Sequence, residues 1–110
     1  MTQETIEQGK TMAIISYLTI LGTIIAFFMN NETKNTFASF HIRQALGLWL
    51  TFFALGYIIG SFDSWLITLS FWIFFGVLFI FGFMTAVSGR TQTTPLLGNF
   101  YQKIFASLGK

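Results

Sequence analysis

The sequence predicts an all-α membrane protein: one domain over residues 1–110, built as a polytopic transmembrane bundle of three membrane-spanning helices with a C-terminal amphipathic surface helix. Two observations predict this class. Of the residues, 54% are hydrophobic and only 9% are charged, whereas a soluble domain carries about 25% charged residues. The charges also divide the chain into three long uncharged segments. Because so few charges cannot cover a surface that faces water, most of the chain is expected to face lipid.

Each of the three uncharged segments has the length of a membrane span. They contain 21, 19 and 26 residues, and a helix needs roughly 20 residues to cross about 30 Å of hydrocarbon. Asn35 or Thr36 is a suitable cap for the second helix, and Asp63 or Ser64 for the third. The expected spans cover about residues 11–29, 40–60 and 64–87.

The C-terminal segment has the pattern of a short amphipathic helix. Thr94 and Pro95 are typical of a helix start, with Thr as the N-cap and Pro in the first helical position. Apolar residues then recur at helical spacing on one face as far as Leu108. Because this stretch is two-faced and too short to cross the bilayer, we expect an interfacial helix over about 95–108. Lys103 argues against the alternative that it forms a fourth span.

The basic residues predict the orientation of the bundle. With three spans, the loop at 30–43 and the C-terminal tail share one side, which holds five of the six basic residues. The other side holds only Lys10. Since loops rich in Lys and Arg remain in the cytoplasm, we expect the N-terminus outside and the C-terminus in the cytoplasm.

The residues that the chain lacks exclude several kinds of chemistry. There is no cysteine, which removes disulfides, thiolate metal sites and cysteine nucleophiles. His41 is the only histidine and lacks converging metal ligands, and no Ser or Thr is accompanied by a base. We therefore expect no catalytic residue, metal or cofactor, and no enzyme. Scattered basic residues argue against nucleic-acid binding, and the absence of ionisable residues within the spans argues against a self-sufficient transporter.

Two groups of residues remain as candidate sites. His41 and Arg43 are expected near the cytoplasmic end of the second span, where Arg43 would meet lipid phosphates or where both would form a polar site for a partner. Gly56 and Gly60 match the small-xxx-small pattern that lets helices approach closely. This pattern predicts helix packing, either within the monomer or between two copies.

The segment that opens the second span resembles a known family. Its residues are Phe40-His41-Ile42-Arg43-Gln44-Ala45-Leu46, similar to the F-H-x-x-Q-A-L signature of small bacterial relatives of Tic-twenty, a chloroplast inner-envelope protein import component. Ala86-Val87-Ser88-Gly89 and Pro95-Leu96-Leu97-Gly98 resemble the closing pattern of that family, and Ser16-Tyr17-Leu18 is also similar. The positions that match are His41, Gln44, Ala45, Pro95 and Gly98.

The resemblance implies a polytopic helical membrane protein, which in plastids is linked to protein translocation. The chain departs from the plastid proteins by having three expected spans instead of four and no extended N-terminal region. The matching residues also have a physical interpretation. His41 and Gln44 lie one helical turn apart, so both could hydrogen-bond the Arg90–Pro95 linker and pin the surface helix to the bundle.

Three functions remain open at this point. The first is a non-catalytic, Tic-twenty-like subunit that assists protein translocation or insertion in the bacterial inner membrane. The second is a structural or accessory subunit of another membrane complex, or an envelope-stress protein. The third is a pore formed by an oligomer. The expected partners are the lipid bilayer and either other membrane proteins or further copies of this chain.

Overall fold

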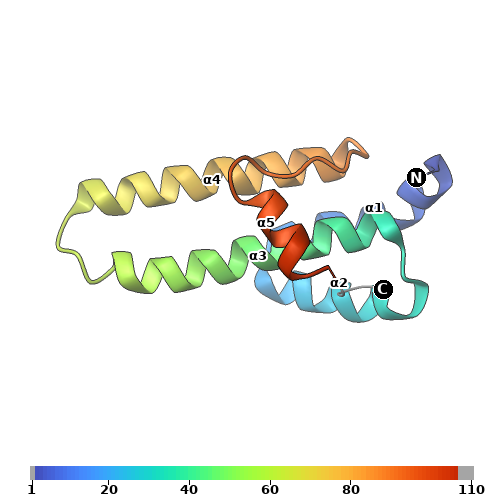
Figure 1. Ribbon diagram of the computed structural model, residues 1–110, viewed down its shortest axis with the longest axis horizontal. Coiled ribbons are helices and arrows are strands. Elements are labelled where there is room, and N and C mark those ends of the chain that lie inside the picture. The colour runs from blue at the N-terminus through green and yellow to red at the C-terminus, as the bar shows by residue number, and fades with distance from the viewer. Residues whose placement is uncertain (1, 107–110) are drawn as a thin grey trace.

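The computed structural model describes residues 2–106, and this part of the chain is all-helical, without strands (Figure 1). The molecule is elongated, with Cα extents of 48 × 22 × 22 Å. Its larger core cluster consists of buried aromatic and aliphatic side chains from α1, α3, α4 and α5. A smaller core cluster joins α1, α2 and α3. The helices are α1 (Gln3–Leu18), α2 (Ile20–Thr33), α3 (Thr36–Ile59), α4 (Trp65–Val87) and α5 (Gly98–Ile104).

The two long helices, α3 and α4, form a hairpin that runs the length of the molecule (Figure 1). Each begins at a side-chain cap, because the Asn35 side chain accepts from the Ala38 N–H and the Ser64 side chain accepts from the Ile67 N–H. Both are long and apolar enough to cross a membrane. The second and third expected spans therefore correspond to α3 and α4.

The single helix expected over 11–29 is wrong, because the chain reverses direction at Thr19. Thr19 has an extended backbone that ends α1, and its hydroxyl oxygen accepts from the Gly22 N–H at 2.9 Å to start α2. A side chain at Gly22 would collide with the Ile15 carbonyl, so glycine permits the two helices to approach. The described residues therefore contain two candidate spans, and the first expected span, over 11–29, is replaced by a pair of shorter antiparallel helices.

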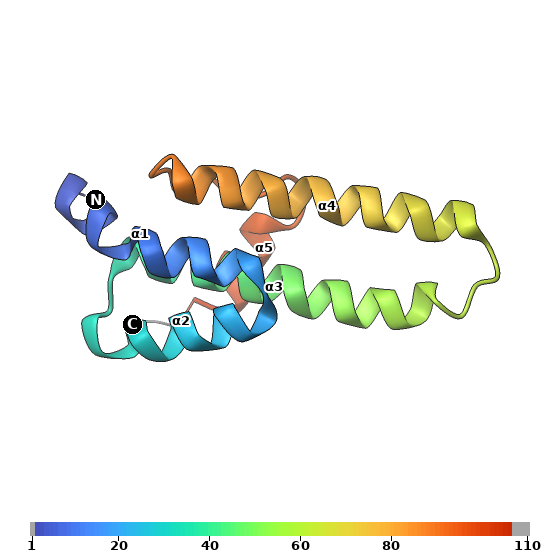
Figure 2. The same ribbon diagram turned by 180° about the vertical axis from the view of Figure 1, so that it is seen from behind.

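The α1–α2 hairpin packs beside the first half of α3 and the last half of α4 (Figures 1 and 2). The N-terminal end of α1 lies at the same end of the molecule as the α2–α3 turn, where the Asn35 side-chain amide donates to the Thr5 carbonyl at 2.8 Å. This arrangement corrects the expectation that a first span separates the N-terminus from the loop at 30–43.

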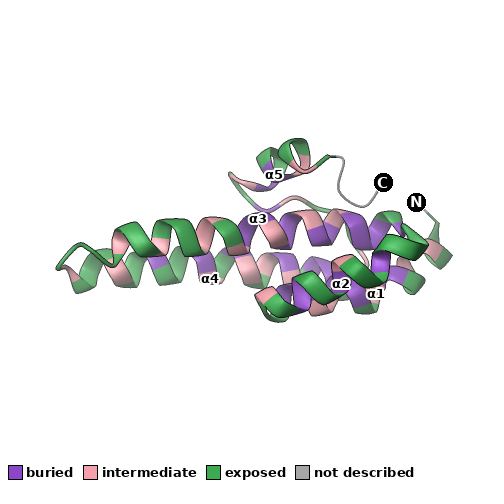
Figure 3. Cartoon of the chain, turned by 90° about the horizontal axis from the view of Figure 1, so that it is seen from below, coloured by how far each residue is buried: buried purple, intermediate pink, exposed green. Residues whose placement is uncertain are grey.

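The C-terminal helix is shorter than expected and begins later. Instead of covering 95–108, α5 begins at Gly98 and ends at Ile104, and residues 107–110 lie outside the described part. Pro95 leads into a turn because Leu96 has a left-handed backbone (φ 69°), which a helix does not accommodate. Figure 3 shows α5 lying against α3, on the side away from α1 and α2.

Candidate functional site

The sequence motif in the first half of α3 forms a buried polar network. His41 and Gln44 are both fully buried, although the sequence suggested an interfacial position for them. One helical turn apart on α3, they face Tyr17 from α1 and the linker between α4 and α5. Three segments that are distant in the sequence therefore meet at these two side chains.

The imidazole of His41 joins α1 to the linker. Its Nε2 atom lies 2.6 Å from the Arg90 carbonyl oxygen and its Nδ1 atom lies 2.7 Å from the Tyr17 hydroxyl. Because a carbonyl oxygen only accepts, Nε2 must carry the hydrogen. The Tyr17 hydroxyl then donates to Nδ1 of the neutral ring, an assignment that follows from the pairing. Both ring nitrogens are thus occupied.

The amide of Gln44 makes the second connection. Its nitrogen donates to the Tyr17 hydroxyl at 2.8 Å and to the Gln92 carbonyl at 3.4 Å. Its oxygen accepts from the Thr94 N–H at 2.8 Å. The hydrogen bonds that the sequence suggested between His41, Gln44 and the linker are therefore present.

A second set of contacts fixes α5 on α3. The Arg43 side chain is half-buried and donates through Nε to the Gln102 side-chain oxygen at 2.8 Å. Gln102 in turn donates to the Phe40 carbonyl at 2.8 Å. The Tyr101 hydroxyl donates to Thr51 at 2.7 Å, and burial raises the pKa of Tyr101 above its ordinary value. Arg43 thus contacts α5, and its expected contact with lipid phosphates stays a prediction.

The glycines divide into those that pack closely and those that do not. A side chain at Gly98 would meet Thr93 and the Gln44 amide oxygen, so Gly98 belongs to the network; Pro95 is exposed in the turn beside it. Gly56 lies at an ordinary contact distance from the Phe71 ring, and Gly60 ends α3. Much tighter contacts occur at other glycines, including Gly47 against the Tyr101 ring and Gly82 against the Tyr17 ring.

Sequence reasoning did not identify Tyr17 as the centre of the network. Its hydroxyl lies within 2.8 Å of both Gln44 and His41, while its ring packs against Gly82 of α4. The available signal was the family-like Ser16-Tyr17-Leu18 segment. Because Tyr17 lies within an apolar run, the sequence does not show that its hydroxyl points inward. Only the return of α1 beside α3 brings this hydroxyl to the motif.

The arrangement is suited to holding segments together. Its hydrogen-bonded groups come from two helices and a linker, and they pair with one another around the buried side chains of Tyr17, His41 and Gln44. Within residues 2–106, no three His, Asp or Glu side chains gather in a way that could hold a metal ion.

The fold and the site define a class: a small all-helical protein with two candidate membrane-crossing helices and a buried polar tie between its α3 helix and its C-terminal segment. Comparisons with family models, curated proteins and solved structures found no match for this chain. The similarity to the Tic-twenty-like family therefore stays a prediction from the motifs.

Proposed function

We propose that this chain is an integral membrane protein of the bacterial inner membrane that acts, without chemistry of its own, as a subunit assisting the translocation or insertion of polypeptides. The observation that carries this proposal is the buried polar tie, in which His41 and Gln44 of α3 hydrogen-bond the α4–α5 linker and Gly98 packs against Gln44. These family-like residues come together as a scaffold whose polar groups are engaged with one another. Such a scaffold supports a binding or guiding role better than a catalytic one.

The exposure of the two long helices supports the membrane location. In the most apolar 18-residue stretch of each helix, only 28% of α3 and 22% of α4 is buried inside the protein. The core helix of a soluble protein would be mostly buried, and contiguous exposed apolar surface of this extent needs lipid or a partner. The most exposed large apolar residues of α4 are Trp65, Leu66, Trp72, Ile73, Val77, Ile80 and Met84.

The far half of the α3–α4 hairpin supports the role with polypeptides. Beyond the tip of α1–α2, the two helices stand alone (Figure 1) and carry an apolar groove of about 420 Å³. Phe53, Tyr57 and Trp72 line this groove and are largely exposed or half-exposed. An aromatic groove open to the membrane is a suitable surface for a passing apolar segment.

The proposal is tested with a photoreactive amino acid placed at Trp72, in the groove, and at Leu78, which is buried on the same helix. Cells carry a C-terminally tagged chain and a secreted precursor arrested during translocation. We expect Trp72 adducts with the precursor or with translocase subunits, and none from Leu78.

Adducts of Trp72 with one resident membrane complex and never with precursor would contradict the translocation role and support the accessory alternative. Adducts only with a second copy of the chain would instead favour a self-associating protein and the pore alternative.

A further inference from the structure

We propose that α1 and α2 form a re-entrant hairpin that is inserted in a single leaflet, so that both described ends of the chain lie on the cytoplasmic side of the membrane. This inference rests on the proposed membrane location. The partner that the hairpin contacts is the acyl-chain layer of the cytoplasmic leaflet.

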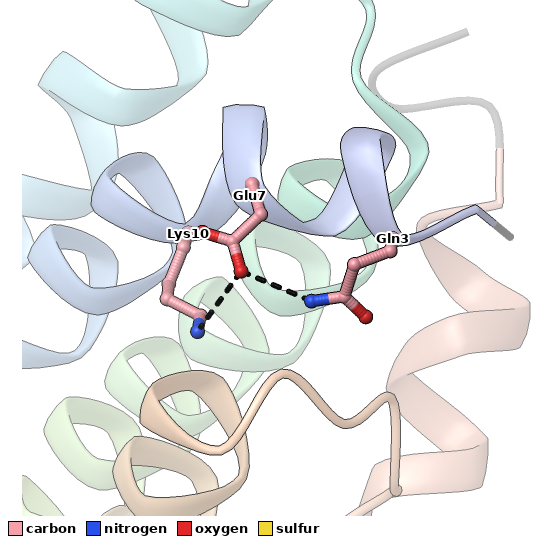
Figure 4. A network of polar contacts seen from close by, with 3 residues as sticks. All are labelled: Gln3, Glu7 and Lys10. Atoms are coloured by element: carbon pink, nitrogen blue, oxygen red, sulfur yellow. Dashed lines mark hydrogen bonds and ion pairs between the residues drawn. The ribbon is translucent and has the colours of Figure 1, made fainter.

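The hairpin is too short to cross the bilayer. The first two turns of α1 are polar and belong in water, with the Gln3 amide donating to Glu7 at 3.0 Å and Lys10 Nζ 4.0 Å from Glu7 (Figure 4). The 14 residues of α2 extend about 21 Å, against about 30 Å of hydrocarbon. The apolar part of α2, residues 20–29, extends about 15 Å, which is the depth of about one leaflet.

The tip of the hairpin lies at the depth of the middle of α3. The Trp49 indole N–H donates to the Ser16 carbonyl at 3.2 Å, and Trp49 follows the start of α3 by about 20 Å of helix, where the whole of α3 measures about 36 Å. Figures 1 and 2 show the same position for the turn between α1 and α2.

The outward surface of the hairpin remains apolar as far as its tip. Leu18 and Leu21, on either side of the turn, are 58% and 67% exposed. A turn in a soluble protein carries polar residues, whereas exposed leucines at a turn are expected where the turn faces hydrocarbon. The exposed large apolar residues of the hairpin are Leu18, Leu21, Ile24, Ile25, Phe28 and Met29.

Several backbone groups at the tip are bonded by nearby residues, which lowers the cost of surrounding this turn with lipid. The Ser16 carbonyl, at the end of α1, accepts from the Thr23 hydroxyl at 2.6 Å as well as from Trp49. The Thr19 carbonyl accepts from the Thr23 N–H at 3.0 Å, and the Thr19 hydroxyl caps Gly22. These bonded groups at the turn do not need water as a partner.

The charges assign one end of the α1–α2 hairpin to the cytoplasm. This open end, where α1 begins and α2 ends, lies opposite the tip at Thr19. Contacts of Asn35 with Thr5, of His41 with Arg90 and of Gln102 with Phe40 place the ends of α1, α4 and α5 together. The far turn carries Asp63 and no basic residue. Loops rich in Lys and Arg remain in the cytoplasm, and the basic residues at the open end are Lys10, Lys34, Arg43, Arg90 and Lys103.

The test uses single cysteines, since the chain has none of its own. Gln8→Cys, Asn31→Cys, Ser61→Cys and Thr91→Cys replace exposed residues and are treated in spheroplasts with a membrane-impermeant maleimide. We expect Ser61→Cys to be labelled in intact spheroplasts, and the other three only after permeabilisation. Leu21→Cys is expected to stay unlabelled until detergent is added.

Labelling of Gln8→Cys from outside, with Asn31→Cys protected, would show a full span and overturn the proposal. Ready aqueous labelling of Leu21→Cys would also overturn it. These outcomes are separate from failure of the proposed function. Recovery of the chain in the soluble fraction would refute the membrane location itself, and loss of precursor crosslinks would leave the labelling pattern unchanged.

Discussion

At the scale of single residues, the buried amide of Gln44 makes three hydrogen bonds in the network, one more than the His41 imidazole. It donates to Tyr17 on α1 and accepts from the Thr94 backbone in the linker. A buried polar group that loses its partner destabilises the fold, because it has given up its hydrogen bonds to water and gains none in return. Substitutions around Gln44 are therefore expected to change stability in a direction set by which groups they leave unpaired.

Replacing Gln44 with Leu leaves the Thr94 N–H and one side of the Tyr17 hydroxyl without a partner. We expect a loss of about 1–3 kcal/mol in unfolding free energy for a stranded group of this kind, together with faster protease cleavage after the linker. Gln92→Leu is the matched control, because the Gln92 side chain is exposed. Unchanged protease protection of the C-terminal segment in Gln44→Leu would contradict the role of the tie.

Thr94→Val is expected to act in the opposite direction. The Thr94 hydroxyl is buried and has no hydrogen-bond partner among the described residues, whereas its backbone N–H is bonded to Gln44. Valine has nearly the same shape and removes the unpaired hydroxyl, so we expect an increase of about 1 kcal/mol in unfolding free energy. Thermal unfolding in detergent measures it, with Thr91→Val, at an exposed position, as control. A clear loss of stability would indicate that the hydroxyl is bonded.

At the scale of elements, α5 is seated on α3 where the absence of a side chain makes room. The Tyr101 ring lies directly over Gly47, and its hydroxyl reaches Thr51 one turn further along. A seven-residue helix is too short to be stable alone. Its position therefore depends on this contact and on the hydrogen bond between Arg43 and Gln102.

Gly47→Leu is expected to displace α5, because the new side chain occupies the position of the Tyr101 ring. The displaced Tyr101 would become exposed, so its raised pKa should fall toward the ordinary value in a spectroscopic titration. Gly76→Ala is the control, since nothing lies near that position on α4. It should be neutral or stabilising by up to about 1 kcal/mol. An unchanged Tyr101 titration in Gly47→Leu would argue against the contact between the Tyr101 ring and Gly47.

The α1–α2 turn offers a second prediction at this scale. Thr19→Leu with Gly22→Leu removes the cap of α2 and blocks the close approach to Ile15. A straight apolar helix over 11–29 should then compete with the hairpin, and Gln8→Cys should become partly labelled from outside. Thr11→Leu, an exposed threonine of α1, is the control and should leave the labelling unchanged. If the double variant were labelled like the parent chain, the Thr19 cap and Gly22 would not be what makes α1 and α2 fold back.

At the scale of the whole molecule, the proposed orientation rests on the distribution of charge. Five described basic residues lie at the open end and none at the far turn. The proposed topology therefore predicts one strongly preferred direction of insertion. In the proposed membrane location, the exposed apolar surface of α3 and α4 is the driving force for insertion. This surface gives no direction, because both leaflets offer it the same hydrocarbon.

Ser61→Lys with Asp63→Lys places two basic residues at the far turn and should weaken this preference. We expect part of the population to insert the other way, so that Thr91→Cys becomes labelled in intact spheroplasts. Ser61→Gln with Asp63→Asn changes the same positions without adding positive charge and serves as control. An unchanged orientation of the lysine variant would mean that packing, not charge, directs insertion.

The sequence by itself determined the helical class, the two long apolar helices and their caps, because composition, charge spacing and N-cap chemistry are local properties. It also led to His41, Gln44 and the linker, through a motif and a one-turn spacing. Only the tertiary structure decided that the apolar run at 11–29 folds back at Thr19 and that Tyr17 completes the network. The physical reason is that local helix propensity is a weak guide that tertiary contacts override, and the contacts with Trp49 and Gln44, far along the chain, favour the hairpin.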